Sequence, residues 1–134
     1  MTIDKQIIVL PNLFDKISGV FSTHNNLIIA VDFDDTIYDW KEKGYSCDYV
    51  LNLVKKCQVK LNAKIILFTC RDGEHLDFAV NYCITNGIVL HGINENPDHP
   101  PTKSKPFYNI LLDDKASLSE TCSALEKLIY TIEE

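Results

Sequence analysis

The sequence lacks any hydrophobic stretch long enough to cross a membrane, and residues 1–5 lack the apolar run of a secretory signal peptide. It also lacks an excess of positive charge, since the formal net charge of its 134 residues is −6. A chain with this charge has no broad, non-specific affinity for nucleic acid, although a local basic patch can still hold one phosphorylated end. Glycine and proline are sparse, with five residues of each, and the composition is that of a soluble globular protein. Because no stretch of the sequence could span a membrane, we expect no membrane partner.

The five cysteines include no C-x-x-C pair and are odd in number, so they indicate neither a zinc site nor a framework of disulfides. Cys57, Cys83 and Cys122 fall in predicted helices, where a buried free thiol acts as a small hydrophobic side chain. Cys70 is also predicted to be packed rather than catalytic. Free thiols of this kind fit a reducing compartment, and we expect the protein to be cytoplasmic.

Segments with strand patterns alternate with segments of helical periodicity along the chain. Helices are predicted over residues 13–21, 48–61, 74–85 and 117–131. Buried strands are predicted over residues 27–33, 64–69, 88–93 and 108–113. Ser117 and Glu120 have capping-box spacing at the start of the last helix. The alternation predicts one α/β domain over residues 1–134, with a central, mostly parallel sheet in a Rossmann-like three-layer α/β/α arrangement.

Two carboxylates two residues apart close the strand predicted at 27–33. Asp32 and Asp34 would point to the same side if the strand continued, because successive side chains in a strand alternate between its faces. Two such charges repel each other, which raises the pKa of one of them unless a cation intervenes. The pattern therefore favours a metal or a reaction at this position over an acidic turn that only caps the next element.

Other polar residues follow the remaining strands at the same edge, and in open parallel α/β sheets ligands bind beyond the carboxyl ends of the strands. Taken singly, each of these residues has a structural explanation, such as a helix cap or a solvated surface charge. Together they place carboxylates, a hydroxyl and cations at one edge. The residues that gather there are Asp32, Asp34, Thr69, Arg71, Lys103, Lys105, Asp113 and Asp114.

Clustered carboxylates call for a divalent cation, and ligands that are all oxygen suit Mg²⁺. A Mg²⁺ ion beside cationic and hydroxyl groups is typical of a phosphate site, where the ion neutralises the phosphate's charge. A free carboxylate at such a site can attack phosphorus, and a second one can protonate the leaving group. The residues therefore indicate phosphoryl chemistry with Mg²⁺ as the cofactor.

In their order, these motifs resemble those of the haloacid dehalogenase (HAD) superfamily of Mg²⁺-dependent phosphohydrolases. The D-x-D-x-T motif matches residues 32–36, and a threonine at a strand end, a lysine and an acidic pair follow it over residues 27–114. The chain is more similar still to small capless members that have a strand ending in T-C-R and a lysine eight residues before D-D. Residues 69–71 and Lys105 reproduce that pattern, which favours Lys105 over Lys103 as the motif lysine.

The resemblance implies that Asp32 is the nucleophile, which forms an aspartyl-phosphate and also ligates Mg²⁺. It implies that Asp34 is the general acid and base, with its carbonyl oxygen on the metal. Asp113 would ligate Mg²⁺ with support from Asp114. Asp35 stands where many members have glycine, a departure that concerns the local turn and not the chemistry.

The resemblance also implies contacts with the substrate. Thr69 and Lys105 would hold the phosphoryl oxygens, and Arg71 would contact the phosphate or the leaving group. The stretch at residues 37–47, called the flap below, is too short for a cap domain, so we expect an exposed site. Such a site suits a nucleic-acid end or phosphoprotein, or a small substrate closed off by the neighbouring subunit of a homo-oligomer. Tyr38, Trp40 and Tyr45 in the flap would either stack on the substrate or pack the flap onto the body.

Residues 1–26 precede the part that the resemblance covers and are interpreted as an N-terminal extension. A short apolar run at residues 6–10 would add a strand at the sheet edge beside Asp113. The function expected is a Mg²⁺-dependent phosphomonoesterase acting on nucleotides or other small phosphate esters. The alternatives are a phosphatase for nucleic-acid ends and a non-catalytic phosphate-binding regulatory protein on the same scaffold. A phospho-acceptor receiver domain is disfavoured, because its acidic pair comes first along the chain and its lysine comes last.

Overall fold

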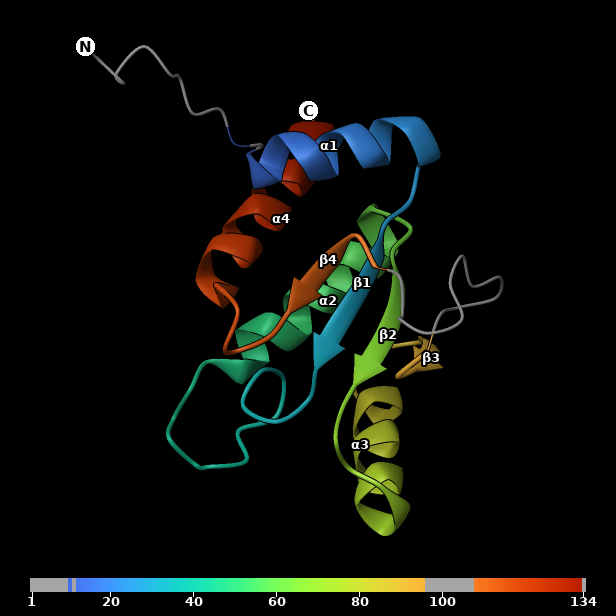
Figure 1. Cartoon of the computed structure of the whole chain (residues 1–134), viewed down its shortest axis with the longest axis vertical. Helices are drawn as coiled ribbons and strands as arrows, with labels where there is room; N and C mark the ends of the chain where they lie inside the picture. The colour runs from blue at the N-terminus through green and yellow to red at the C-terminus, as the bar shows by residue number, and fades with distance from the viewer. Residues whose placement is uncertain (1–9, 11, 96–107, 134) are drawn as a thin grey trace, which may run out of the picture.

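Four parallel strands form the centre of the structure, a computed structural model that describes residues 10, 12–95 and 108–133 (Figure 1). Four helices flank this sheet, consistent with a Rossmann-like three-layer fold, so the predicted α/β class is confirmed. The elements in chain order are α1 (Leu13–His24), β1 (Ile28–Asp32), α2 (Cys47–Lys60), β2 (Lys64–Phe68), α3 (Gly73–Thr85), β3 (Leu90–Ile93), β4 (Ile110–Leu112) and α4 (Leu118–Glu133).

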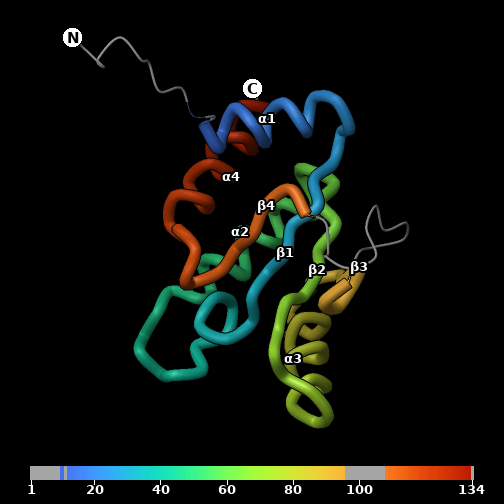
Figure 2. The backbone as a smooth tube through the Cα atoms, in the orientation of Figure 1, coloured from blue at the N-terminus to red at the C-terminus, as the bar shows by residue number. Residues whose placement is uncertain are grey.

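The strand order β3-β2-β1-β4 places β1 inside the sheet, between β2 and β4. The register pairs Asp32 with Phe68 on β2, and Val31 with Leu112 on β4. All of these pairings are parallel, so the carboxyl ends of β1, β2 and β4 lie at one edge (Figure 2). The residues that follow these three strands are thereby brought together at that edge.

The hydrophobic core lies between the sheet and the helices. Alternate residues of the strands enter it, including Ile29, Val31, Ile65 and Leu67, each at most 1% exposed. In the view of Figure 1, α2 lies behind β1 and β4, α4 lies beside β4, and α1 crosses near the amino ends of the strands. Burial of an apolar side chain of this size stabilises a fold by about 1.5–3 kcal/mol, and this core fixes the strand ends that carry the site.

Residues with capping side chains or left-handed backbone mark the ends of the helices. Asn12 caps α1, because its Oδ1 accepts from the backbone N–H of Phe14 at 2.8 Å. α3 ends at Thr85, as its predicted range required, and Gly87 lies just beyond the helix with φ 90°. Ser117 differs from the prediction. Its φ of 52° is left-handed, whereas a capping-box residue has extended backbone.

One expectation lies largely outside the described residues: the short apolar run at 6–10, of which only Leu10 is described. Among the described residues, none of the helices combines the length and apolar character needed to cross a bilayer. Cys57, Cys83 and Cys122 are buried, as predicted. Cys70 is exposed, so the prediction that it is packed was wrong. It follows β2 in a turn, beyond the part of the strand that the core covers.

Candidate active site

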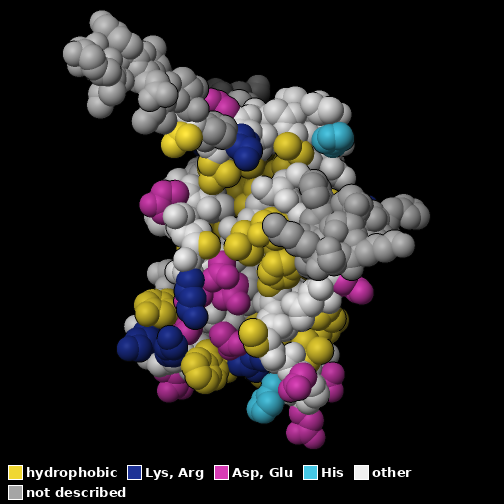
Figure 3. All heavy atoms as spheres, in the orientation of Figure 1, with side chains coloured by type: hydrophobic (Ala, Val, Ile, Leu, Met, Phe, Trp, Pro, Cys, Tyr) yellow, Lys and Arg dark blue, Asp and Glu magenta, His cyan; other side chains and the backbone are white. Residues whose placement is uncertain are grey.

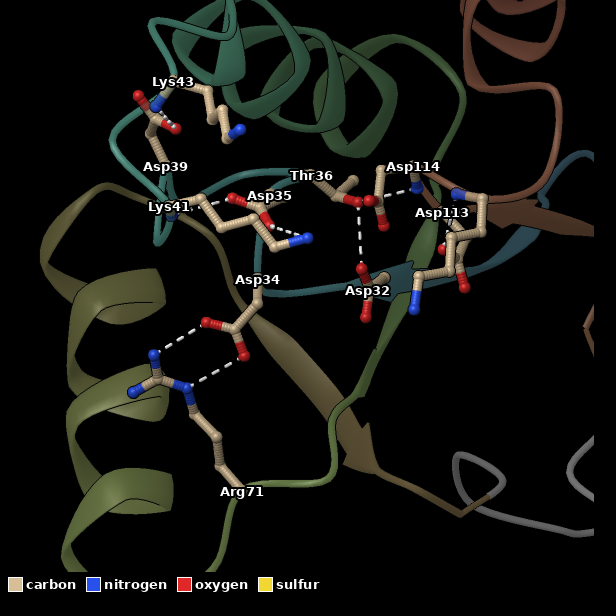
Figure 4. Close-up of polar contacts among 11 residues, drawn as sticks. Asp32, Asp34, Asp35, Thr36, Asp39, Lys41, Lys43, Arg71, Asp113 and Asp114 are labelled. Atoms are coloured by element: carbon tan, nitrogen blue, oxygen red, sulfur yellow. Dashed lines mark hydrogen bonds and ion pairs between the residues drawn. The ribbon is translucent and has the colours of Figure 1, made fainter.

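Three carboxylates meet at the carboxyl edge of the sheet. Asp32 ends β1, while Asp113 and Asp114 follow β4, and each offers an oxygen within 4.8 Å of the others (Figure 4). The parallel register of β1 and β4 accounts for this, because it places residues 32 and 113 side by side. In Figure 3, acidic side chains gather over the ends of these strands.

Asp32 has a strongly perturbed acidity. Its pKa is raised from 3.8 to about 7, chiefly by burial and then by the nearby charges of Asp113 and Asp114, against a lowering hydrogen bond from Thr36. This repulsion among carboxylates is what a divalent cation would remove, and an all-oxygen donor set fits Mg²⁺. Asp32, Asp113 and Asp114 are therefore the side chains that could hold such an ion.

Thr36 connects the ends of the two strands. Its hydroxyl donates to Asp32 Oδ2 at 3.0 Å, and its Oγ1 accepts from the backbone N–H of Asp114 at 3.0 Å. The side chain is fully buried, so these bonds are shielded from water. Thr36 thus orients Asp32 toward Asp113 and Asp114. The D-x-D-x-T motif contained this residue, but sequence reasoning assigned it no role.

Asp34 belongs to a different set of contacts from Asp32. Arg71, the only arginine of the sequence, donates to Asp34 Oδ1 at 2.7 Å from Nη2 and to Oδ2 at 3.1 Å from Nε. Figure 4 shows the Asp34 carboxylate turned toward Arg71, while Asp32, Asp113 and Asp114 group together. The hydrogen bond with Asp34 raises the pKa of Arg71. The structure therefore places Arg71 on the second carboxylate of the motif.

The guanidinium of Arg71 is itself held by aromatic rings. It lies 5.0 Å from the ring centroid of Phe33, 5.7 Å from that of Tyr38 and 5.6 Å from that of Phe78. Its side chain is only 14% exposed. Cation–π contact and the bidentate ion pair together leave the Arg71–Asp34 unit little freedom.

Thr69 directly follows β2, at the predicted edge. Its Oγ1 accepts from the backbone N–H of Arg71 at 3.1 Å, so the hydroxyl proton is directed elsewhere. Asn94 fixes the backbone of Thr69 by accepting from its N–H at 3.0 Å and donating to its carbonyl at 2.9 Å. Asn94 was not among the residues predicted for the site. Its position directly after the strand predicted at 88–93 was the one indication in the sequence. Lys103 and Lys105 lie outside the described residues.

Two carboxylates shape the flap, because Asp35 ties it to the site and Asp39 closes a turn within it. Asp35 is buried with φ 61°, and it accepts from the backbone N–H of Lys41 at 3.1 Å. Asp39 accepts from the backbone N–H groups of Lys43 and Gly44 at 3.0 and 2.9 Å. Of the two alternatives for the flap aromatics, Tyr38 packs against the body, where its ring stacks 5.2 Å from that of Phe33. Trp40 and Tyr45 are exposed.

Comparisons with known proteins bear on the fold. No protein-family model and no curated protein matches the sequence. A solved structure described as a conserved protein coded by a locus of Bacteroides thetaiotaomicron is similar, with 26% identity and a TM-score of 0.57. The similarity covers 69% of this chain and 78% of that one. That description names no activity, so the comparison supports the α/β architecture alone.

Proposed function

We propose that the protein is a Mg²⁺-dependent phosphomonoesterase of the HAD type, which works through an aspartyl-phosphate on Asp32. The observation that carries the proposal is the grouping of Asp32 with Asp113 and Asp114, in which Thr36 orients the Asp32 carboxylate. The resemblance of the ordered motifs to that superfamily supports it. When bound, Mg²⁺ would be held by these three carboxylates and the Asp34 carbonyl and would neutralise charge on the phosphoryl group.

In the first step, a carboxylate oxygen of Asp32 forms a bond to phosphorus, and the ester P–O bond breaks. The leaving oxygen keeps that electron pair and takes a proton from Asp34. In the second step, water attacks the aspartyl-phosphate, Asp34 takes its proton, and the bond between phosphorus and Asp32 breaks. Inorganic phosphate and a free Asp32 carboxylate result. Thr69 has a hydroxyl proton available for a phosphoryl oxygen, and Lys105 is proposed for the other contact.

The Arg71–Asp34 pair gives this cycle a physical constraint. The two hydrogen bonds from Arg71 hold the Asp34 carboxylate in one orientation, and this carboxylate accepts a proton from water in the second step. The proton gained there serves the leaving group of the next turnover. Protonated Asp34 can no longer accept both charge-assisted bonds, so the pair loosens once in every cycle. Arg71 is therefore a positioning residue for the proton transfer.

A phosphatase screen with Mg²⁺ tests the proposal, using sugar phosphates, nucleoside monophosphates and oligonucleotides phosphorylated at the 5′ or 3′ end. We expect release of phosphate from at least one class, loss of that activity with EDTA, and loss in Asp32→Asn. Asp77→Asn, an exposed position on α3, is the matched control and keeps the activity. Activity that survives in Asp32→Asn would exclude Asp32 as the nucleophile.

The same screen separates the alternatives. Turnover confined to phosphorylated oligonucleotides would show that the protein is a phosphatase for nucleic-acid ends. Absence of turnover in every class, together with phosphate binding measured by calorimetry, would favour a non-catalytic phosphate-binding protein.

A further inference from the structure

A cavity of about 510 Å³ lies next to the acidic cluster, between residues at the start of α2 and at the start of α4. Thr36 and Asp114 line one side of it, and both also contact or adjoin Asp32. The cavity therefore borders the site at which the proposed chemistry takes place. Its volume is in the range of pockets that bind small molecules.

The lining has the chemistry of a site for a neutral ring system. Tyr45 and Tyr49 line it with side chains that are 52% and 46% exposed, so their rings offer free surface. Val50 and Leu118 add apolar contacts. Ser46 also lines the cavity, and although it is the N-cap residue of α2, its side chain makes no cap hydrogen bond. That hydroxyl is available to a ligand.

The charges of the lining disfavour an anionic group in this cavity. The described residues that line it include the carboxylates of Asp35 and Asp114 and neither lysine nor arginine, although Lys41, outside the lining, pairs with Asp35 at 3.8 Å. A phosphate placed here would meet like charge, so the phosphate of a substrate belongs on the Asp32 side of Asp114. What remains for the cavity is an uncharged part with a planar face and hydrogen-bonding groups.

We propose that this cavity binds the nucleoside portion of a nucleotide whose phosphate lies at Asp32. A base can stack on a tyrosine ring, and the serine hydroxyls can bond to polar edges of the base or to ribose. The placement of the phosphate rests on the proposed function, whereas binding of the nucleoside does not. The substrate class that follows is nucleoside monophosphates.

Titration of the full chain with adenosine and with cytidine, followed by backbone amide NMR shifts, tests the cavity without any phosphate. We expect shifts at residues of the lining such as Ser46 and Ser119. Ser123→Trp places a bulky ring in the lining and should abolish them, while Ser22→Trp on α1 is the matched control and leaves them unchanged. D-ribose alone should give no shifts at these positions.

A second pair of variants covers failure of Ser123→Trp to fold. Tyr45→Ala removes one ring of the lining and should weaken adenosine binding about fivefold, a value in the range of one lost stacking contact. Trp40→Ala removes an exposed flap aromatic outside the lining and should not change it. Adenosine binding that is absent, that persists in folded Ser123→Trp, or that D-ribose reproduces would overturn the proposal.

Steady-state kinetics then test whether the phosphate of a bound nucleotide lies at Asp32. The ratio of kcat/KM for adenosine 5′-monophosphate to that for acetyl phosphate should fall at least tenfold in Ser123→Trp, mainly through KM. An unchanged ratio would overturn the nucleotide assignment. If Asp32-dependent turnover is absent for every phosphoester, the proposed function fails, and the adenosine titration still decides whether the cavity binds nucleosides.

Discussion

At the scale of single residues, Asp32 and Asp34 are separated by the turn that follows β1. The strand pattern predicted that the two carboxylates would repel each other, but the chain leaves the strand after Asp32, and residue 34 forms an isolated bridge with Tyr38. The charges that raise the pKa of Asp32 come from Asp113 and Asp114 instead. A raised pKa at this carboxylate pair could be predicted from the sequence. The identity of the charges that raise the pKa of Asp32 could not, because the β1–β4 register brings them there.

Asp32 is expected to destabilise the metal-free protein at high pH. Its pKa is 3.8 in the unfolded reference and about 7 in the fold, so the folded state binds the proton more tightly. The free energy that protonated Asp32 contributes to folding is complete below pH 4. It declines as the pH rises and is lost once the pH passes 7. Asp32→Asn should therefore raise the free energy of unfolding at pH 8 by about 2 kcal/mol, a value reduced for partial exposure to solvent.

Urea denaturation in EDTA at pH 5 and pH 8 measures this effect. The gain from Asp32→Asn should be less than half as large at pH 5, because unfolded Asp32 has then lost its proton but the pH is still well below the pKa of folded Asp32. Mg²⁺ at pH 8 should stabilise the wild type more than the variant. Equal gains at both pH values would show that electrostatic repulsion at Asp32 is not their cause.

Arg71 offers a second test at this scale, which rests on the proposed function. Arg71→Lys keeps a positive charge but cannot hold both oxygens of Asp34 or cover three rings with a planar group. We expect kcat to fall about tenfold, equivalent to about 1.4 kcal/mol, with a smaller change in KM. The pH profile of kcat should shift as well, which loss of folding alone would not produce. If kcat and its pH profile are unchanged in Arg71→Lys, Arg71 does not position Asp34 for proton transfer.

At the scale of elements, the sequence predicted strands and helices well and the contacts between them poorly. Apolar runs and helical periodicity located both ends of each described element to within about three residues, because the side chains that set these patterns also form the core. The pairs Thr36–Asp114 and Asn94–Thr69 join segments far apart along the chain. No local pattern encodes such a pair, since each depends on strand register and on turn conformation.

The flap turn is expected to depend on Asp39. Both oxygens of its carboxylate accept backbone N–H groups, from Lys43 and Gly44. Asp39→Ala leaves both donors to water and should speed hydrogen exchange at these two amides about fivefold, as expected for a loss of about 1 kcal/mol. Asp39→Asn retains one acceptor oxygen and should give an intermediate rate. Exchange that is equal in all three proteins would mean that the turn is held by other contacts.

At the scale of the whole molecule, residues 1–26 were interpreted as an extension because the motif pattern does not require them. In the structure, α1 packs against the common core, and Ile17 is its one buried residue, at 1% exposure. Contacts with α4 hold the rest of the helix. The motifs describe the chemistry of one sheet edge, and for that reason they carry no information on what covers the opposite end of the sheet.

Ile17→Ala tests whether α1 belongs to the cooperative core. Removal of the buried side chain leaves a cavity among packed residues, and the free energy of unfolding should fall by about 3 kcal/mol. Lys16→Ala, at an exposed position on the same helix, should change it by less than about 0.5 kcal/mol. Chemical denaturation followed by circular dichroism measures both. A loss for Ile17→Ala no larger than that for Lys16→Ala would show that α1 unfolds independently. A single transition with the full loss would show that α1, although outside the motif pattern, stabilises the sheet whose far edge holds Asp32.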